Sequence, residues 1–218
     1  AVWGLTATVQ HVHKLEDVRE FLKERGVSSV IGKPGPRSKH PGQILGCDWG
    51  SARSVEDEVD GYVYVGTGEF HPLGVFLATG KPVVSINPVS NTHERLEFSM
   101  KYFLKRRMAA VEKARSGERI GLLASSKRGQ NRLEVAEELA SGLEDRGYEA
   151  YILVGDEIDF AGLSDYRLDA FVNAACPRIS IDDSELFDSP VLTPFEARVL
   201  IGEEEWEPYR LDEMGLNF

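Results

Sequence analysis

The order of local patterns along the chain limits its fold more than any other sequence feature. Stretches typical of strands alternate with stretches typical of amphipathic helices through most of the 218 residues. Residues 4–10 form the first strand-like stretch, and residues 14–26 follow it with apolar side chains at helical spacing. These side chains belong to Leu15, Val18, Phe21 and Leu22. This alternation predicts an α/β fold in which mostly parallel sheets are flanked by helices.

The remaining predicted elements continue the alternation. Further strands are predicted at 27–32, 61–66, 82–87, 119–125, 148–155 and 168–176, and further helices at 51–59, 71–79, 94–117, 131–147 and 193–202. The last helix opens with a capping box, in which Thr193 is the cap, Pro194 takes the first helical position and Glu196 lies three residues after the cap. Ser51 is expected to cap the helix at 51–59.

The two halves of the chain echo each other. Residues 14–26 and 132–147 each follow a strand, carry Leu-Glu near the start and end in Arg-Gly. We therefore expect two similar α/β domains, residues 1–90 with Cys47 and residues 91–218 with Cys176. A single doubly wound sheet is the alternative.

Charge and cysteine usage narrow the function classes. A formal net charge of −11 disfavours nucleic acid as a partner, and no apolar run approaches the ~20 residues that span a bilayer. Two widely separated cysteines do not form a disulfide framework, so the cytoplasm is the expected compartment. The chain begins with Ala-Val-Trp directly in a predicted strand, which suggests a portion of something longer.

Two glycine-rich stretches resemble nucleotide-binding motifs and fail in detail. The dinucleotide fingerprint over residues 65–74 requires a third glycine where the chain has His71. A phosphate-binding loop over residues 74–82 has five residues between its glycines where four are needed, and Pro82 stands where Ser or Thr should bind magnesium. Neither motif is therefore predicted to be functional.

The two cysteines both follow apolar runs at the point where a strand gives way to a loop. Ligands collect at the carboxyl ends of strands in parallel α/β sheets. Cys47 lies in a glycine-flanked turn that leads into a helix, and Cys176 ends the run at 168–176. Thiolates from distant parts of a chain can hold an iron–sulfur cluster. The alternative is that both are small buried hydrophobes, since free cysteine is among the most buried residue types.

Four motifs in order resemble one family. Residues 41–47 (PGQILGC), 65–74 (VGTGEFHPLG), 173–183 (NAACPRISIDD) and 192–197 (LTPFEA) are similar to the diphthamide biosynthesis enzymes, the 2-(3-amino-3-carboxypropyl)histidine synthases, in their archaeal form. The resemblance implies three homologous α/β domains that each give one cysteine to a 4Fe–4S cluster. Cys47 matches the second-domain ligand and Cys176 the third-domain ligand. The first-domain cysteine has no counterpart here, as expected if that domain is absent from the chain.

The resemblance also implies a reaction and partners. The reduced cluster donates an electron to S-adenosylmethionine, and a 3-amino-3-carboxypropyl radical then adds to carbon 2 of a histidine in translation elongation factor 2. This is the first step of diphthamide biosynthesis. A homodimer is expected from the family, with neither nucleic acid nor membrane as a partner.

Four further residues are predicted to contact the cofactor. Lys127, Arg128 and Arg132, in the basic stretch 125–132 before a helix, suit an anion such as the cofactor carboxylate. The family resemblance adds Gln130, because the family has a similar Gly-Gln segment. Gly66 and Gly68 would let the backbone approach a ligand. The alternatives are a solvated basic turn that includes Lys127 and Arg132, and a tight strand-to-helix turn. His71 and Asp182 lie inside matching motifs, and helix capping is the simpler interpretation of both.

Two other functions remain open at this point. The chain could belong to a scaffold subunit that supports a catalytic partner, because eukaryotic members of the family resembled here work as heterodimers. It could also be a small-molecule-binding α/β protein with two inert thiols.

Overall fold

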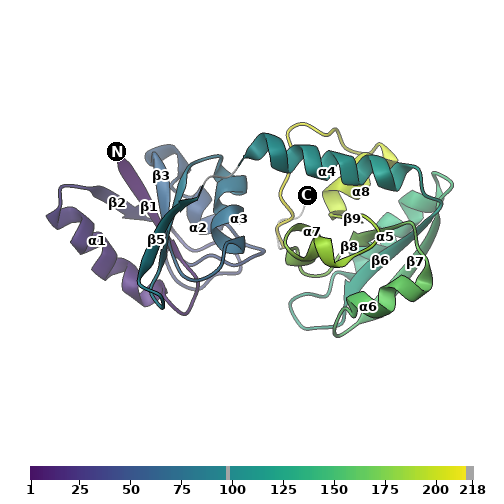
Figure 1. Cartoon of the computed structure of the whole chain (residues 1–218), viewed down its shortest axis with the longest axis horizontal. Helices are drawn as coiled ribbons and strands as arrows, with labels where there is room; N and C mark the ends of the chain where they lie inside the picture. The colour runs from purple at the N-terminus through teal and green to yellow at the C-terminus, as the bar shows by residue number, and fades with distance from the viewer. Residues whose placement is uncertain (97–98, 215–218) are drawn as a thin grey trace. The chain divides into compact units, whose positions relative to one another are not determined.

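The computed structural model describes residues 1–96 and 99–214, and the chain divides into two compact units (Figure 1). Unit 1 comprises Ala1–Met100 and Glu213–Phe218, and unit 2 comprises Lys101–Asp212. No helix in the described part of the chain is both long enough and apolar enough to cross a membrane.

Unit 1 is built on a five-stranded sheet with the order β2-β1-β3-β4-β5. The first four strands in that order run parallel, and β5 pairs antiparallel with β4. The strands are β1 (Val2–Ala7), β2 (Ser28–Ile31), β3 (Gly61–Val65), β4 (Val83–Asn87) and β5 (Thr92–Leu96).

The helix predicted at 94–117 is wrong at its start. Residues 94–96 belong to β5, where Glu94 lies opposite Ser85 and Arg95 opposite Val84. Pairing with the edge of β4 outweighs the helical preference of this charged stretch. The predicted domain boundary at residue 90 therefore lies inside the turn between β4 and β5. The helix α4 runs from Met100 to Arg115. The predicted positions 97 and 98 lie outside the described residues.

The helices of unit 1 are α1 (Leu15–Glu24), α2 (Gly50–Arg53) and α3 (Phe70–Thr79). Helix α1 packs Leu15, Val18 and Leu22 against the core under β1 and β3, as its spacing predicts. Phe21 is instead 53% exposed. Its ring lies under the Arg25 guanidinium, 3.5 Å from the ring centroid, so the apolar stripe is narrower than predicted.

Ser51 does not cap a helix, contrary to the prediction. Trp49 is the capping residue of α2, and Ser51 lies one position inside the helix. The Ser51 hydroxyl donates to the Gly32 carbonyl at 3.1 Å and accepts from the Gly42 amide at 3.0 Å. It therefore joins two loops, and the short helix ends at Arg53 where residues 51–59 were predicted to be helical.

Unit 2 is built on a four-stranded parallel sheet with the order β7-β6-β8-β9. Its strands are β6 (Arg119–Ser125), β7 (Glu149–Gly155), β8 (Ala170–Asn173) and β9 (Val191–Leu192). Besides α4, its helices are α5 (Leu133–Glu144), α6 (Phe160–Leu163), α7 (Arg178–Ile181) and α8 (Pro194–Ile201).

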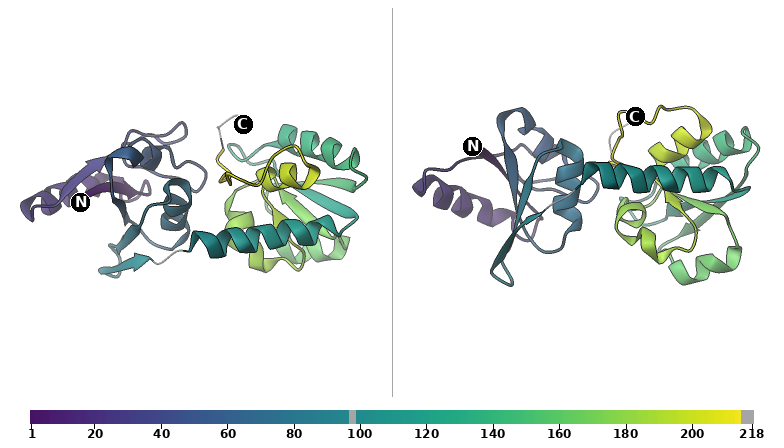
Figure 2. Two further views of the ribbon diagram at one scale, coloured as in Figure 1. Left: turned by 90° about the horizontal axis from the view of Figure 1, so that it is seen from above. Right: turned by 45° about the horizontal axis from the view of Figure 1, so that its top comes forward.

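Helices cover both faces of the sheet in unit 2 (Figure 2). Apolar side chains of α4, α5 and α8 pack on one face, against Ile120, Leu122 and Ala124 of β6. Residues of α6 and α7 pack on the other, around Leu123 and Phe171. The predicted fold, α/β with mostly parallel sheets flanked by helices, is thus confirmed.

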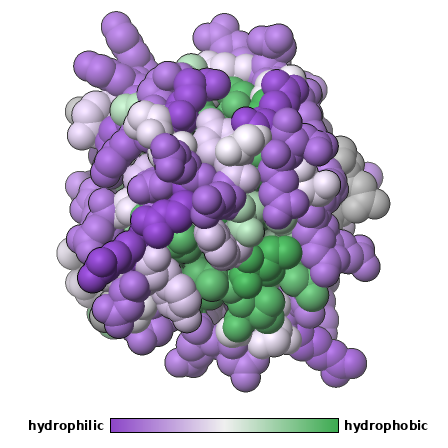
Figure 3. All heavy atoms as spheres, turned by 90° about the vertical axis from the view of Figure 1, so that its right-hand side faces the viewer, coloured by the Kyte–Doolittle hydropathy of each residue, from purple (hydrophilic) through white to green (hydrophobic). Residues whose placement is uncertain are grey.

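Strand β7 forms an open edge of the sheet in unit 2. Its side chains Tyr151, Ile152 and Val154 are exposed, and hydrophobic side chains gather on the face seen in Figure 3. An edge strand of this kind is a template for pairing with another chain.

Candidate thiol sites of the two units

Cys47 lies at the tip of a tight turn beside the carboxyl end of β1. Leu45 and Asp48 exchange two backbone hydrogen bonds, of 3.0 and 3.1 Å, so that Gly46 and Cys47 form the two-residue tip. The chain just before this turn is joined to β1, because Ala7 donates its amide to Gly42 and accepts one from Ile44, both at 2.9 Å. The short apolar run before Cys47 is therefore attached to the sheet by one bridge and forms no strand of its own.

Asp48, the residue after the thiol, anchors the loop before it. Its buried carboxylate accepts hydrogen bonds from the Arg37 amide at 2.9 Å, the Ser38 hydroxyl at 2.8 Å and the Gly50 amide at 2.9 Å. Three donors compensate the cost of burying this charge. The loop at residues 33–43, which is rich in proline and glycine, is thereby joined to the Cys47 turn.

Trp49 joins the Cys47 turn to α3. Its buried ring packs edge-on against Phe70 and His71, with centroids 6.2 and 6.5 Å apart. A Cβ atom on Gly74 would come within 2.1 Å of the Trp49 ring, so only glycine leaves room for it there. The sequence motifs 41–47 and 65–74 consequently build a single local structure.

Both glycines predicted to approach a ligand have a local structural reason. A Cβ atom on Gly66 would lie 2.3 Å from the Tyr64 hydroxyl, and Gly68 has a φ of 74°, which favours glycine. The Tyr64 ring stacks on His71, which lies in the first turn of α3. Burial raises the pKa of Tyr64 to about 12, so this phenol remains protonated at neutral pH. Ligand contact by Gly66 and Gly68 stays a prediction.

Cys176 lies in the loop that joins β8 to α7, at the carboxyl end of a parallel strand as predicted. The buried Asn173 side chain sets the shape of this loop. Its Nδ2 donates to the Cys176 carbonyl at 2.9 Å and to the Ser180 hydroxyl at 3.0 Å, and its Oδ1 accepts from the Ala175 amide at 3.0 Å. Cys176 is half-buried and packs beside the apolar cluster of α6 and α7.

Arg132 holds the same loop from the other side. Its Nε and Nη2 donate to the carbonyls of Ala174 and Ala175, each at 2.9 Å. Its guanidinium also forms a bidentate ion pair with Asp212, with both N–O distances at 2.8 Å. The Arg132 guanidinium thus binds two backbone carbonyls and the Asp212 carboxylate, whereas the sequence suggested a solvated or anion-binding side chain.

The stretch 125–132 contains the turn in which the predicted cofactor ligands Arg128 and Gln130 lie, and the two side chains differ in exposure. Lys127 pairs with Glu157 at 3.3 Å, Arg128 is exposed and Gln130 is half-buried. Helix α5 begins only at Leu133, with Arg132 as its cap residue. Binding of an anion by Arg128 and Gln130 stays a prediction.

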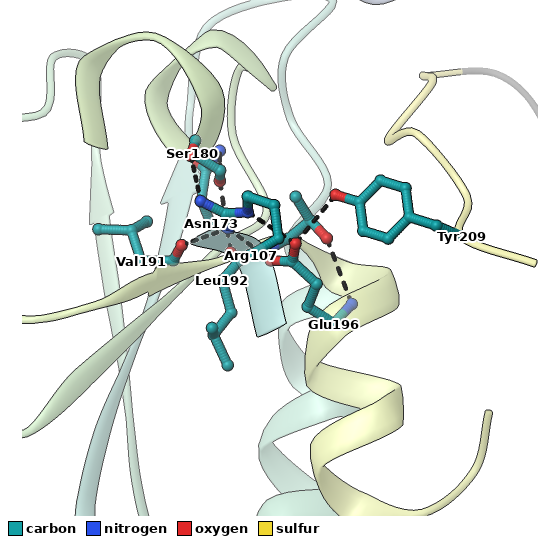
Figure 4. Close-up of polar contacts among 8 residues, drawn as sticks. Arg107, Asn173, Ser180, Val191, Leu192, Glu196 and Tyr209 are labelled. Carbon is teal, nitrogen blue, oxygen red and sulfur yellow. Dashed lines mark hydrogen bonds and ion pairs between the residues drawn. The ribbon is translucent and has the colours of Figure 1, made fainter. Parts of the chain in front are cut away.

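Arg107 and Glu196 form a buried ion pair, which Figure 4 shows together with Asn173, Ser180 and Tyr209. Arg107 of α4 donates to both carboxylate oxygens of Glu196, from Nε at 2.7 Å and from Nη2 at 2.5 Å. Their side chains are 7% and 0% exposed. Burial would by itself lower the pKa of Arg107, but the adjacent Glu196 carboxylate outweighs it and raises that pKa above the ordinary value.

The capping box predicted at 193–196 is confirmed and belongs to this network. The Glu196 amide donates to the Thr193 hydroxyl at 3.2 Å, and the Thr193 amide donates to Glu196 Oε2 at 2.8 Å. The Tyr209 hydroxyl donates to Glu196 Oε1 at 2.9 Å. Burial, with help from the Glu196 charge, raises the pKa of Tyr209 well above its ordinary value, so this donor remains protonated.

Ser180 connects the ion pair to the thiol loop. Its carbonyl accepts from Arg107 Nη1 at 2.7 Å, while its hydroxyl accepts from Asn173, which in turn holds the Cys176 carbonyl. The motifs 173–183 and 192–197 therefore share one buried polar network. Asp182 is the C-cap residue that follows α7, and its carboxylate pairs with Arg178 at 2.8 Å.

Each unit contributes one thiol. Cys47 and Cys176 are both half-buried and both free of disulfides. Among residues 1–96 and 99–214, no three His, Cys, Asp or Glu side chains form a group that could hold a metal ion.

The fold and the thiol sites define a class of protein: parallel α/β units, each of which carries one partly accessible cysteine in a loop beside the carboxyl end of a strand. Residues 3–210 match the family model described as putative diphthamide synthesis protein. The chain belongs to this family, which confirms the resemblance found in its four motifs.

The relatives give the family context. The chain is 36% identical over 210 residues to 2-(3-amino-3-carboxypropyl)histidine synthase of Pyrococcus horikoshii, which covers 96% of this chain and 59% of that protein. It is 33% identical over 212 residues to subunit 1 of the human synthase, covering 96% of this chain and 47% of the human protein.

The solved structures agree with the sequence relatives. The crystal structure of Dph2 from P. horikoshii with a 4Fe-4S cluster matches with a TM-score of 0.83 and 34% identity, covering 97% of this chain and 60% of that one. The chain therefore spans less than two thirds of the length of these relatives.

Proposed function

We propose that Cys47 and Cys176 are two of the three protein ligands of one 4Fe–4S cluster in a 2-(3-amino-3-carboxypropyl)histidine synthase. The observation that carries this proposal is the matched placement of one half-buried thiol in each α/β unit, beside the carboxyl end of a strand. The relative from P. horikoshii, whose structure is described with a 4Fe-4S cluster, supports the identity of the cofactor.

The donor set fits part of such a cluster. Thiolates are the ligands that iron–sulfur clusters use, and those of one cluster can come from separate parts of a protein. The described residues offer two thiols, so the third anchor lies outside residues 1–218 in this proposal. Three protein ligands would leave one iron open to substrate, as in other metal sites that keep a free position.

The bound cluster would supply the electron that cleaves S-adenosylmethionine, so that its 3-amino-3-carboxypropyl group transfers to carbon 2 of a histidine in elongation factor 2, the first step toward diphthamide. The chain's own residues hold and orient the reactants. Asp48 and Asn173 fix the two thiol loops. Arg128 and Gln130 would bind the methionine carboxylate, where a cation and an amide donor suit an anion.

The remaining proposals concern the surroundings of the site. Gly66 and Gly68 would allow the backbone to lie close to the cofactor. Elongation factor 2 would be the protein substrate. The working form would be a homodimer in the cytoplasm, and light scattering on a sizing column can measure its oligomeric state. The net charge of −11 makes nucleic acid a poor partner.

The test is anaerobic reconstitution of the protein with iron and sulfide, using residues 1–218 together with any sequence that adjoins them. We expect a brown protein with absorbance near 400 nm, and loss of that absorbance in Cys47→Ala and in Cys176→Ala. Ser116→Ala, an exposed hydroxyl, is the matched control and should keep it. A colourless wild type, or a cluster unaffected by either cysteine change, would contradict the proposal.

The same preparation separates catalysis from a supporting role. Eukaryotic relatives are named as subunits, which gives a scaffold function a concrete basis. Formation of methylthioadenosine from S-adenosylmethionine, with elongation factor 2 present, would identify an enzyme. A stable cluster that yields no methylthioadenosine with any reductant tested would favour the role of a scaffold subunit.

A further inference from the structure

Three consecutive residues near the described C-terminal end bond either to the Cys47 turn or to Arg132, which holds the Cys176 loop. Asp212, Glu213 and Met214 lie in a segment without regular structure, yet all three are buried. Acidic side chains are almost never fully buried unless they are paired, so the partners of Asp212 and Glu213 reveal what the segment holds.

Asp212 acts on the Cys176 loop inside unit 2. Its two carboxylate oxygens accept from Nη1 and Nη2 of Arg132, each at 2.8 Å. The same guanidinium holds the carbonyls of Ala174 and Ala175, the two residues before Cys176. The carboxylate thereby fixes the direction of the guanidinium, which in turn fixes the backbone that leads into the thiol.

Glu213 and Met214 act on the Cys47 loop inside unit 1. Glu213 Oε1 accepts from Arg53 of α2 at 2.9 and 2.6 Å, and its Oε2 accepts from the Trp49 amide at 3.4 Å, a long bond. The Met214 amide donates to the carbonyl of Cys47 itself at 2.9 Å. Glu213 and Met214 therefore both form hydrogen bonds to the segment that carries the Cys47 thiol.

We propose that Asp212–Met214 is a positioning strap that couples the conformations of the Cys47 and Cys176 loops. Because the three residues are joined by two peptide bonds, a shift of the strap on one loop changes its hold on the other. The proposal rests on the proposed function for its purpose, since one shared cluster requires both thiols to be ready together. Its physical content, the coupling, can be tested without a cluster.

The test measures the alkylation rate of each cysteine by mass spectrometry in the cluster-free protein, with iodoacetamide as the probe. Asp212→Asn and Glu213→Gln keep side-chain size and remove one charge each. We expect each variant to raise the rates at both Cys47 and Cys176, by about fivefold, the effect of a modest change in a local opening equilibrium. Glu205→Gln removes an equal charge from an exposed position nearby and should change neither rate.

A glycine inserted between residues 212 and 213 provides a second variant, which keeps every side chain and breaks only their register. Acceleration at both cysteines, with circular dichroism unchanged, supports the strap. If Asp212→Asn accelerated alkylation only at Cys176, and Glu213→Gln only at Cys47, the two contacts would be independent and the coupling would be overturned. No change of rate in any variant would also overturn it. A wild type that binds no cluster would defeat the proposed function and leave these rates interpretable.

Discussion

The Cys47 turn and the Cys176 loop present the same chemical group by different means. Cys47 is held mainly by residues close in sequence: a two-residue turn, the neighbouring Asp48 carboxylate and the ring of Trp49. Cys176 depends on a buried network whose ion pair joins residues 89 positions apart. Local contacts make a site that tolerates change elsewhere, whereas a buried polar network transmits the loss of any one member.

The largest expected effect is in the network behind Cys176. Glu196→Ala leaves the Arg107 charge buried without its carboxylate, and we predict a loss of about 3–5 kcal/mol in the unfolding free energy of unit 2. Glu138→Ala breaks an ion pair to Arg198 in which the glutamate side chain is 62% exposed, and it should cost less than about 1 kcal/mol. Denaturant titration compares the two, and equal losses would refute the importance given to burial.

A middle-sized effect is expected at the Cys47 turn. Gly74→Ala places a methyl group against the Trp49 ring, and we predict destabilisation of about 1–3 kcal/mol. The alkylation rate of Cys47 should rise more than that of Cys176, because the contact lies wholly in unit 1 and acts on the Cys176 loop only through Asp212–Met214. Adding Trp49→Leu should make the glycine change nearly harmless. Equal acceleration of alkylation at both cysteines would contradict the view that the Cys47 turn is supported mainly by local contacts.

The smallest effect is expected at the capping box. Thr193→Ala removes one acceptor at the start of α8 and should cost about 1 kcal/mol, with Glu196 still bound to Arg107. Thr193→Ser keeps the hydroxyl and is the control. A loss as large as that of Glu196→Ala would mean that the cap, and not the ion pair, supports the network.

Sequence patterns revealed the elements whose signals are local. Apolar patterns located β1, which lies beside the Cys47 turn, and β8, which leads to Cys176, and the capping box located the start of α8. The strand expected directly before Cys47 is only a single bridge. The patterns missed β5, because its structure comes from pairing with β4. Arg107, one of several basic residues on α4, received no prediction, and Arg132, which pairs with a residue 80 positions away, was expected in a basic turn. Such partners become visible only when the chain is folded.

The most direct test of the central claim is iron content in a double-mutant comparison. Anaerobically reconstituted wild type, Cys47→Ala, Cys176→Ala and the double variant would be measured for iron per chain and for the electron paramagnetic resonance signal after reduction. If both thiols hold one cluster, each single variant loses nearly all of the signal, and the double variant loses no more. Retention of about half of the iron in each single variant, with total loss only in the double, would show two separate sites and contradict the account.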